Sequence, residues 1–229
     1  VRGAKVHTSA STQAHEIVVL PTRAMGEGEG DWSIAFAVPV NTPGLRLLAS
    51  PFGDGDHRPG ERPISARHKM METITIFDDV FVPSERIFLK GEWQFAGILA
   101  NAFVEFHRFT AVSYKPPLCD LFIGAAALLA DLNGIGRASH VREKLTKLIT
   151  YAETVRGLSL AAAHQCRISD AGTAVPNVLY TNLAKHYFAS NYHQAVAWVQ
   201  DIAGGLVVTG PSEEDLDNPA TREYIEHFL

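Results

Sequence analysis

Hydrophobic residues follow two patterns along the chain, and the first gives way to the second after Pro83. Up to that point, short runs rich in β-branched and aromatic residues are separated by Gly, Pro and Asp, which is typical of strands and turns. We therefore expect a β domain over residues 1–92. Its predicted strands lie at residues 1–6, 17–20, 34–38 and 73–77, with a hairpin loop at 26–31 and a longer loop at 50–63.

Beyond Pro83, apolar residues recur at intervals of three and four over stretches too long for strands. This spacing predicts helices, which we place at residues 95–113, 120–133, 140–168 and 176–202. Long helices joined by short polar loops favour an antiparallel bundle, because each helix then buries its apolar stripe against the others. The predicted fold class is α+β: a barrel- or sandwich-like sheet domain, then an antiparallel helical bundle over residues 93–229.

Residues with strong positional preferences mark the ends of these helices. Side-chain caps and prolines favour the first turn, whereas glycine favours the position after the last turn. The expected boundaries are a cap at Ser139, a first-turn proline at Pro176, a break at Pro116-Pro117 and an end at Gly204-Gly205.

The balance of charge excludes some classes of partner. With 25 acidic and 20 basic residues, the formal net charge is −5, so neither nucleic acid nor an anionic membrane surface is expected as a partner. No stretch approaches the roughly 20 apolar residues that cross a bilayer, and no signal peptide opens the chain. We expect a cytoplasmic protein. Because the chain begins at Val1 rather than Met, we also expect a piece of a longer protein that lacks an N-terminal part.

Two cysteines, Cys119 and Cys166, lie far apart without a CxxC pair or a nearby Cys/His run. Such spacing predicts neither a disulfide framework nor a structural zinc site. Each is expected to be a small buried apolar side chain.

The segment His7-Thr8-Ser9-Ala10-Ser11-Thr12 gathers small and hydroxyl residues beside one imidazole, directly after a strand-like run. A loop of this composition offers backbone N–H groups and hydroxyls with little bulk, which suits close hydrogen bonding to the edge of a flavin. An ordinary Ser/Thr turn has the same composition, so both interpretations stay open.

His107 and Arg108 lie in the middle of the first predicted helix, with Tyr114 and Lys115 one to two turns later. Burying a His and an Arg carries a desolvation cost unless they are paired, so they indicate a partner or a ligand. The alternative is that Arg108 lies on a solvated face and His107 is satisfied between helices. Adjacent helical residues point about 100° apart, so the two are not expected to reach one ligand.

Two further segments have more than one interpretation. The run from Phe77 to Ile87 ends a strand at Pro83 and is expected to be a domain junction. The run from Asp201 to Leu206 is rich in glycine, which either allows close approach to a bound group or simply ends the helix.

Six segments, in this order, resemble the family of 4-hydroxyphenylacetate 3-monooxygenase and 4-hydroxybutyryl-CoA dehydratase. They are HTSAS from His7, FDDVFVPSERIF from Phe77, His107-Arg108, IGAAALLADLNG from Ile123, Ser139-His140-Val141, and DIAGGLVVTGPSEEDL from Asp201.

The resemblance implies an acyl-CoA-dehydrogenase-like fold that binds FAD and assembles as a homotetramer, with an N-terminal helical domain absent from this chain. It also implies that His7, Thr8 and Ser9 lie against the flavin. Gly204 and Gly205 of a neighbouring subunit are expected to approach the same cofactor.

The two branches of the family differ at one helix. The dehydratase branch binds a [4Fe–4S] cluster through the histidine that matches His107 and a cysteine seven residues later, with a tyrosine four residues after the histidine. This chain has Ala111 at the tyrosine position and Tyr114 at the cysteine position. Cys119 lies five residues past the expected cysteine ligand. A phenol is a poor replacement for the thiolate of such iron sites. We therefore expect no metal and no cluster.

Without a cluster, the resemblance favours the monooxygenase branch. The expected activity is that of the oxygenase component of a two-component phenol hydroxylase, which uses FADH2 supplied by a flavin reductase. His107, Arg108 and Tyr114 would line the substrate space and orient or deprotonate a phenol. Two alternatives remain: a dehydratase or isomerase acting on a CoA thioester, and a non-catalytic relative that keeps the scaffold for assembly.

Overall fold

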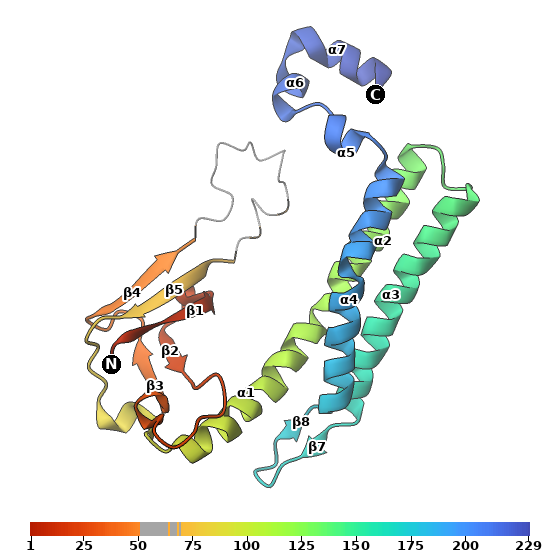
Figure 1. Cartoon of the computed structure of the whole chain (residues 1–229). Helices are drawn as coiled ribbons and strands as arrows, with labels where there is room; N and C mark the ends of the chain where they lie inside the picture. The colour runs from red at the N-terminus through yellow and green to blue at the C-terminus, as the bar shows by residue number, and fades with distance from the viewer. Residues whose placement is uncertain (51–63, 65–67, 69) are drawn as a thin grey trace. The chain divides into compact units, whose positions relative to one another are not determined.

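The computed structural model describes residues 1–50, 64, 68 and 70–229, so the predicted loop at 50–63 lies outside the described residues after Ser50. The chain divides into two compact units (Figure 1). One contains residues 1–101 and 211–229, and the other contains residues 102–210. The predicted boundary at residues 92/93 stays a prediction.

Two three-stranded antiparallel sheets form the β part of the first unit. One has the order β1-β5-β4 and the other the order β2-β3-β6. The predicted strands at 17–20, 34–38 and 73–77 are confirmed, the first predicted strand begins later and runs on to Ser9, and β4 and β6 were not predicted. The strands are β1 Gly3–Ser9, β2 Glu16–Val19, β3 Ile34–Pro39, β4 Leu45–Ala49, β5 Glu72–Phe77 and β6 Ile87–Lys90.

The two sheets share one apolar core. Phe36 of β3 and Phe77 of β5 meet edge to face, with ring centroids 5.6 Å apart. Ile17, Val19 and Val38 complete the strand contribution. The alternating burial along β5 follows from the two-residue period of a strand, so the sandwich-like sheet domain is confirmed.

The turn between β3 and β4 requires glycine. Gly44 has φ +85°, and a Cβ at this position would lie 2.3 Å from the carbonyl oxygen of Asp78. The carbonyl of Gly44 also accepts a hydrogen bond from the Asp78 N–H at 2.9 Å. Both the left-handed backbone and the close approach exclude a side chain here.

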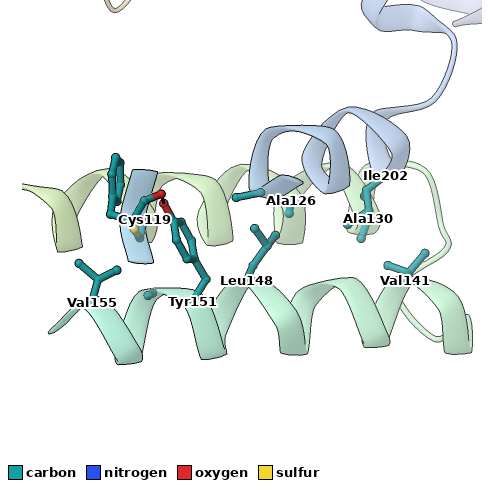
Figure 2. Packing of buried hydrophobic residues seen from close by; sticks show 11 residues of the cluster. Cys119, Ala126, Ala130, Val141, Leu148, Tyr151, Val155 and Ile202 are labelled. Carbon is teal, nitrogen blue, oxygen red and sulfur yellow. Dashed lines mark hydrogen bonds between the residues drawn. The ribbon is translucent and has the colours of Figure 1, made fainter. Parts of the chain in front are cut away.

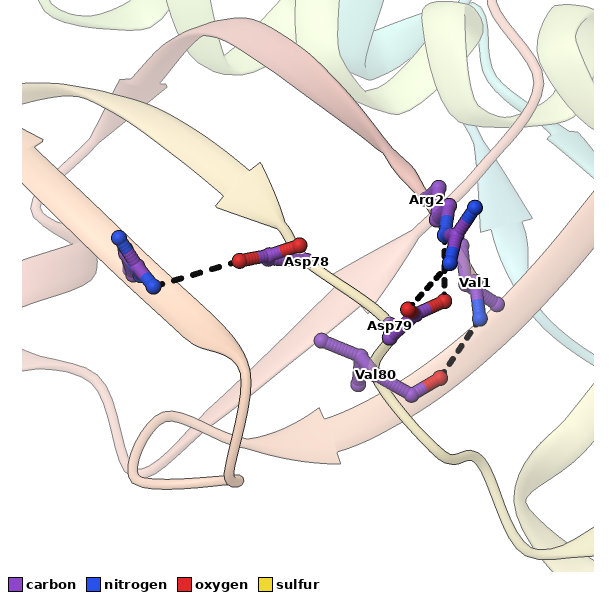
Figure 3. A network of polar contacts seen from close by, with 6 residues as sticks. Val1, Arg2, Asp78, Asp79 and Val80 are labelled. Atoms are coloured by element: carbon purple, nitrogen blue, oxygen red, sulfur yellow. Dashed lines mark hydrogen bonds and ion pairs between the residues drawn. The ribbon is translucent and has the colours of Figure 1, made fainter.

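Charged pairs connect β1 and β4 to the segment that follows β5. Arg2 pairs with Asp79, and Arg46 pairs with Asp78 at 3.2 Å (Figure 3). All four side chains are largely exposed, so solvent screens both pairs and their contribution to stability is small. The run predicted as a junction does not leave the sheet at Pro83, because Ile87 begins β6 and pairs with Phe36 of β3.

The four predicted helices are confirmed, with shifted ends. The third stops at His164 rather than Ile168, because the chain turns there into the short hairpin of β7 and β8. The helices and these two strands are α1 Trp93–Ser113, α2 Lys115–Leu132, α3 Ser139–His164, β7 Arg167–Ile168, β8 Ala174–Val175, α4 Val178–Ala203, α5 Leu206–Thr209, α6 Glu213–Asp217 and α7 Pro219–Phe228.

Helices α2, α3 and α4 pack side by side in the second unit (Figure 1). Asn133, after the end of α2, donates to the Ile202 carbonyl at 3.1 Å, and Lys144 near the start of α3 pairs with Asp201 at 2.5 Å. The ends of α2 and α4 therefore meet the start of α3, so α3 runs antiparallel to both. The antiparallel bundle is confirmed.

Small residues allow these helices to approach closely. Ala126, Ala152 and Ala195 have no exposed surface and lie in the same core as Leu148 and Tyr151 (Figure 2). The Tyr151 hydroxyl donates to the Phe188 carbonyl at 2.7 Å, which satisfies the buried phenol.

Two of the predicted helix boundaries are wrong. Ser139 is the first helical residue, and Ala138 occupies the cap position without a side-chain hydrogen bond. Asn177 caps the fourth helix, since its side chain accepts from the Tyr180 N–H at 3.2 Å, and Pro176 lies before the cap rather than in the first turn. Gly204 does end α4, with φ +74°. The predicted break is confirmed: Tyr114 interrupts the helices, and Pro116 and Pro117 lie in the first turn of α2.

Candidate functional site

His7, Thr8 and Ser9 belong to strand β1 and not to the predicted loop. Thr8 pairs with Thr73 and Ser9 with Glu72 after a register shift that follows Lys5. Sheet pairing with β5 therefore overrides the local preference of small hydroxyl residues for turns. The chain turns only at Ala10, with φ +56°, before the 3-10 helix Ser11–Gln13.

Hydroxyl groups of β1 and β5 form a connected group around Thr8. Thr75 donates to the Thr8 hydroxyl oxygen at 2.9 Å, and Thr73 donates to the Thr8 carbonyl oxygen at 3.2 Å. Ser11 lies 2.6 Å from the Thr73 hydroxyl. On the neighbouring pair, Ser9 donates to Glu72 Oε1 at 2.5 Å. Among the described residues, the buried Glu72 Oε2 has no hydrogen-bond partner.

A cavity of about 370 Å³ lies over the same strands. Its walls are almost entirely apolar, although His7, Glu72 and Thr73 are among the residues that line it. An apolar hollow with a few polar groups at its edge suits a planar heterocycle with hydrogen-bonding edges. The cavity is lined by Val6, His7, Leu48, Ala49, Ser50, Glu72, Thr73 and Ile74.

His107 and Arg108 point in different directions from α1, as expected. The His107 ring is exposed and stacks on Phe103, with centroids 5.0 Å apart. Arg108 is half-buried and donates from Nη1 to Asn182 Oδ1 of α4 at 2.9 Å. The interpretation that places Arg108 on a solvated face is wrong, whereas the expected need for a partner is met by Asn182. His107 is thus the group of this pair that stays accessible.

Tyr114 lies at the break between α1 and α2 and is 57% exposed. The Lys115 ammonium lies 4.6 Å from the centroid of the Tyr114 ring and 4.7 Å from that of Phe188. A cation between two aromatic faces is held by both and limits the motion of the exposed phenol. Tyr114 is therefore presented to solvent or to a ligand on an ordered support.

Cys119 is 1% exposed in the helical core, facing α3 (Figure 2). Burial, with a smaller effect from Asp120, raises the pKa of its thiol from 9.0 to about 11. The thiol is therefore protonated at neutral pH. The expectation of a buried apolar cysteine is confirmed for Cys119, while Cys166 is half-buried. In the described part of the chain, no group of three or more His, Cys, Asp or Glu is placed to hold a metal ion.

Gly204 and Gly205 lie at the far end of the helical bundle from Tyr114. Tyr114 precedes the first residue of α2, whereas the glycines follow the end of α4, which meets the end of α2. Eighteen helical residues separate the two ends, a length of about 27 Å. Within one chain the glycines therefore do not join His107, Arg108 and Tyr114.

Sequence reasoning missed the residues that support these candidates. Thr73, Thr75 and Glu72 were assigned only to a strand, and Asn182 only to a helix. Their partners on other elements lie between 62 and 74 positions away along the chain, so no local pattern connects them. One signal was present in the sequence. Thr73 and Thr75 alternate with isoleucines and therefore share one face of the strand with Phe77, so two hydroxyl groups lie on the face that carries a large aromatic side chain.

The chain matches two family models that together cover nearly all of it. The 4-hydroxyphenylacetate 3-hydroxylase N-terminal model matches residues 1–89, and the C-terminal model of the same family matches residues 96–229.

Curated relatives include members of both branches. The 4-hydroxybutyryl-CoA dehydratase/vinylacetyl-CoA-Δ-isomerase of Clostridium aminobutyricum is 36% identical, over 94% of this chain and 45% of its own length. The 4-hydroxyphenylacetate 3-monooxygenase oxygenase component of Thermus thermophilus is 29% identical, over 100% of this chain and 48% of its own. The chain thus spans about half the length of these relatives.

Solved structures give the same result. A 4-hydroxybutyryl-CoA dehydratase from N. maritimus superposes with a TM-score of 0.90 at 31% identity, covering 100% of this chain and 46% of that one. An oxygenase component of 4-hydroxyphenylacetate 3-monooxygenase complexed with FAD and 4-hydroxyphenylacetate gives 0.88 at 29%, covering 100% and 48%. Butyryl-CoA dehydrogenase from Megasphaera elsdenii, at 18% identity and a TM-score of 0.67 over 98% of this chain and 54% of that one, shows that the fold is acyl-CoA-dehydrogenase-like. The chain belongs to the 4-hydroxyphenylacetate 3-hydroxylase family.

Proposed function

We propose that this chain is part of the oxygenase component of a two-component, flavin-dependent monooxygenase that hydroxylates a phenol. The observation that carries the proposal is the chemistry at the α1–α2 break. An exposed phenol, Tyr114, stands where the family resemblance places the cluster cysteine, and the nearest thiol along the chain, Cys119, is buried and protonated. Several relatives are named as oxygenase components of phenol monooxygenases, which supports the same conclusion.

The residues of β1 and β5 fit a flavin. The cavity beside His7 has apolar walls for the ring system, and Thr8 and Ser9 follow His7 on the same strand. We assign FAD to these residues, bound as FADH2 from a flavin reductase. When bound, reduced flavin supplies the activation of O2 that hydroxylation requires. The chain's own residues hold the cofactor and keep water away from it.

His107 and Tyr114 act on the substrate in this proposal. The exposed imidazole can accept the phenolic proton, and Phe103 fixes its plane. Arg108 donates a hydrogen bond to Asn182 of α4, so its guanidinium connects the two helices and is less free to bind the substrate. As the family resemblance implies, Gly204 and Gly205 reach the cofactor from another copy of the chain. A homotetramer meets that requirement.

A second candidate is a dehydratase or isomerase that acts on a CoA thioester. The 36% identity to the Clostridium aminobutyricum enzyme favours it, and Tyr114 in place of a cysteine opposes it.

Among the described helices, none combines the length and apolar character needed to cross a bilayer. A cytoplasmic location stays a prediction.

The experiment that tests the proposal titrates the purified protein anaerobically with photoreduced FAD and then mixes it with oxygenated buffer and 4-hydroxyphenylacetate. We expect FADH2 binding and a catechol product in place of most of the H2O2 that free FADH2 forms. Anaerobic turnover of 4-hydroxybutyryl-CoA without catechol formation would support the second candidate. Absence of FADH2 binding would support a non-catalytic scaffold.

His107→Ala provides the matched variant in the same assay. If the exposed imidazole acts on the substrate, product per FADH2 falls while the Kd for FADH2 changes less than about twofold, because the ring is exposed and stacks on Phe103 rather than on the proposed flavin cavity. Equal losses in product and affinity would instead assign His107 to cofactor binding.

A further inference from the structure

The second half of α1 carries His107, yet it lies outside the apolar core that the next three helices share. Among the described residues, the core of α2, α3 and α4 includes no residue of α1. A helix at a protein surface is held by an apolar stripe that it buries against its neighbours. Because α1 takes no part in that core, other contacts fix its rotation about its own axis, and with it the direction of the His107 ring.

Two polar contacts attach this half of α1 to neighbouring elements. Glu105 pairs with Arg167 of β7 at 3.0 Å, and Arg108 Nη1 donates to Asn182 Oδ1 of α4 at 2.9 Å. The Arg167 side chain is 63% exposed, so solvent screens the first contact. Arg108 and Asn182 are both half-buried, and in the described part of the chain Arg108 has no carboxylate partner. The amide oxygen of Asn182 is therefore the acceptor that compensates the partial burial of the guanidinium.

The same contacts leave His107 on the other side of the helix. Successive residues of an α-helix are about 100° apart, so Glu105, Arg108 and the buried Val112 fall within a stripe of about 60°. His107 lies about 100° to 160° away from the members of this stripe. Its ring is accordingly exposed and stacks on Phe103, one turn earlier on the same side. Because a hydrogen bond is directional, the bond from Arg108 to α4 limits the rotation of α1.

We propose that Asn182 is a positioning residue: by holding Arg108 it fixes the rotation of α1, and so the direction in which His107 is presented to the phenol. This inference rests on the proposed function, which has His107 accept the phenolic proton. It adds to that site a residue of α4 that needs no contact with the substrate. It also gives a reason for an arginine beside the histidine, since Arg108 connects α1 to α4 while His107 stays accessible.

The test compares Asn182→Leu, which keeps the approximate size and removes the acceptor, with Asn182→Asp, which keeps an acceptor oxygen. Both are assayed with FADH2, oxygen and 4-hydroxyphenylacetate. We expect Asn182→Leu to lower kcat for hydroxylation about tenfold, because a displacement of about 1 Å at a catalytic group can cost about 100-fold. Asn182→Asp should keep kcat within about twofold of the wild type, since a carboxylate accepts from a guanidinium at least as well. If Asn182→Asp lost as much activity as Asn182→Leu, the acceptor would not be the cause and the proposal would be overturned.

The separation of kcat from KM distinguishes positioning from a general loss of structure. Positioning predicts that KM for 4-hydroxyphenylacetate and the Kd for FADH2 stay within about twofold of the wild type while kcat falls. Losses of similar size in all three would overturn the proposal, as would wild-type kcat in Asn182→Leu. Asn191→Leu is the matched control, because the side chain of this half-buried asparagine of α4 donates to the Tyr187 carbonyl of its own helix at 2.9 Å. It should leave kcat unchanged, and a loss equal to that of Asn182→Leu would overturn the proposal.

A double-mutant cycle tests whether the effect passes through His107. In the His107→Ala background, Asn182→Leu should cause no further loss of product per FADH2, because the imidazole that it orients is gone. Losses that add in the double variant would contradict the positioning role. If Asn182→Leu does not fold, as judged by circular dichroism, Asn182→Ala replaces it in the same cycle with the same criteria.

The wild-type assay distinguishes the two levels of failure. Wild-type protein that forms no catechol refutes the proposed function and this inference together. Wild-type protein that hydroxylates the phenol, with Asn182→Leu equally active, refutes the positioning role alone.

Discussion

The adjacent glycines at the end of α4 differ in backbone conformation, so the same substitution should have opposite effects on stability. Gly204 has φ +74° and ψ −157°, a region populated almost only by glycine. Gly205 has φ −65° and ψ −25°, which any residue adopts at the start of a helix. Alanine is therefore strained at Gly204 and unstrained at Gly205.

The magnitudes follow from the backbone alone, because neither new methyl group would clash. A Cβ on Gly204 has no heavy atom within 4 Å, and one on Gly205 meets only Thr209 Oγ1 at 4.0 Å. Gly204→Ala should lower the free energy of unfolding by about 1–3 kcal/mol. Gly205→Ala should raise it by about 0.4–1 kcal/mol, because alanine restricts the unfolded chain more than glycine does.

Urea unfolding followed by circular dichroism measures both variants, and anaerobic titration measures their affinity for FADH2. If Gly205 of one chain approaches the cofactor of another, Gly205→Ala weakens FADH2 binding even though it stabilises the fold. Equal stability of the two variants would refute the assigned backbone conformations. A stabilised Gly205→Ala protein with wild-type affinity would refute the role of this segment in cofactor binding.

Three further predictions concern groups whose surroundings are well defined. With a thiol reagent at pH 8, we expect Cys166 to react in the native protein and Cys119 only after unfolding, because burial raises the pKa of Cys119 to about 11; two fast-reacting thiols in the native protein would contradict this. Tyr151→Phe should lower the free energy of unfolding by about 1 kcal/mol through loss of the hydrogen bond to the Phe188 carbonyl, as measured by urea titration, and a neutral result would contradict the buried bond. Glu29, in the loop before β3, accepts hydrogen bonds from the Arg23 side chain and from the Gly26 N–H, and these lower the pKa of its carboxylate from 4.5 to about 2. The contribution of Glu29 to stability is therefore complete above pH 4.5 and is lost as the pH falls toward 2. Glu29→Gln should flatten this part of the pH profile, and an unchanged profile would show that the carboxylate is not linked to folding.

Strands and helices could be predicted where the hydrophobic residues of a segment follow the period of that element. They were missed where only pairing with a distant strand makes the segment a strand. Strands β2, β3 and β5 are rich in β-branched and aromatic residues and were found. Strand β4 contains Leu45, Arg46, Leu47, Leu48 and Ala49, without a β-branched residue, so only its pairing with β5 makes it a strand. Strand β6 follows a proline turn and was absorbed into the predicted junction.

The candidate site shows the same division. The sequence singled out His107, Arg108 and Tyr114 because charged and polar groups are conspicuous in an apolar helix. It could not reveal that Asn182 holds Arg108, or that Lys115 supports Tyr114 against Phe188, because these contacts depend on packing between helices. His7, Thr8 and Ser9 were noticed for their chemistry and assigned the wrong local structure, since the partner strand lies more than 60 residues away.

The central claim is that this chain works with flavin and without an iron–sulfur cluster. Anaerobic purification, followed by analysis of iron, acid-labile sulfide and flavin in the same sample, tests it most directly. We predict FAD binding with no stoichiometric iron or sulfide, because the family resemblance places Tyr114 at the position of a cluster cysteine, and Cys119 is buried. A full [4Fe–4S] complement per chain, lost when His107 is replaced by alanine, would contradict the claim.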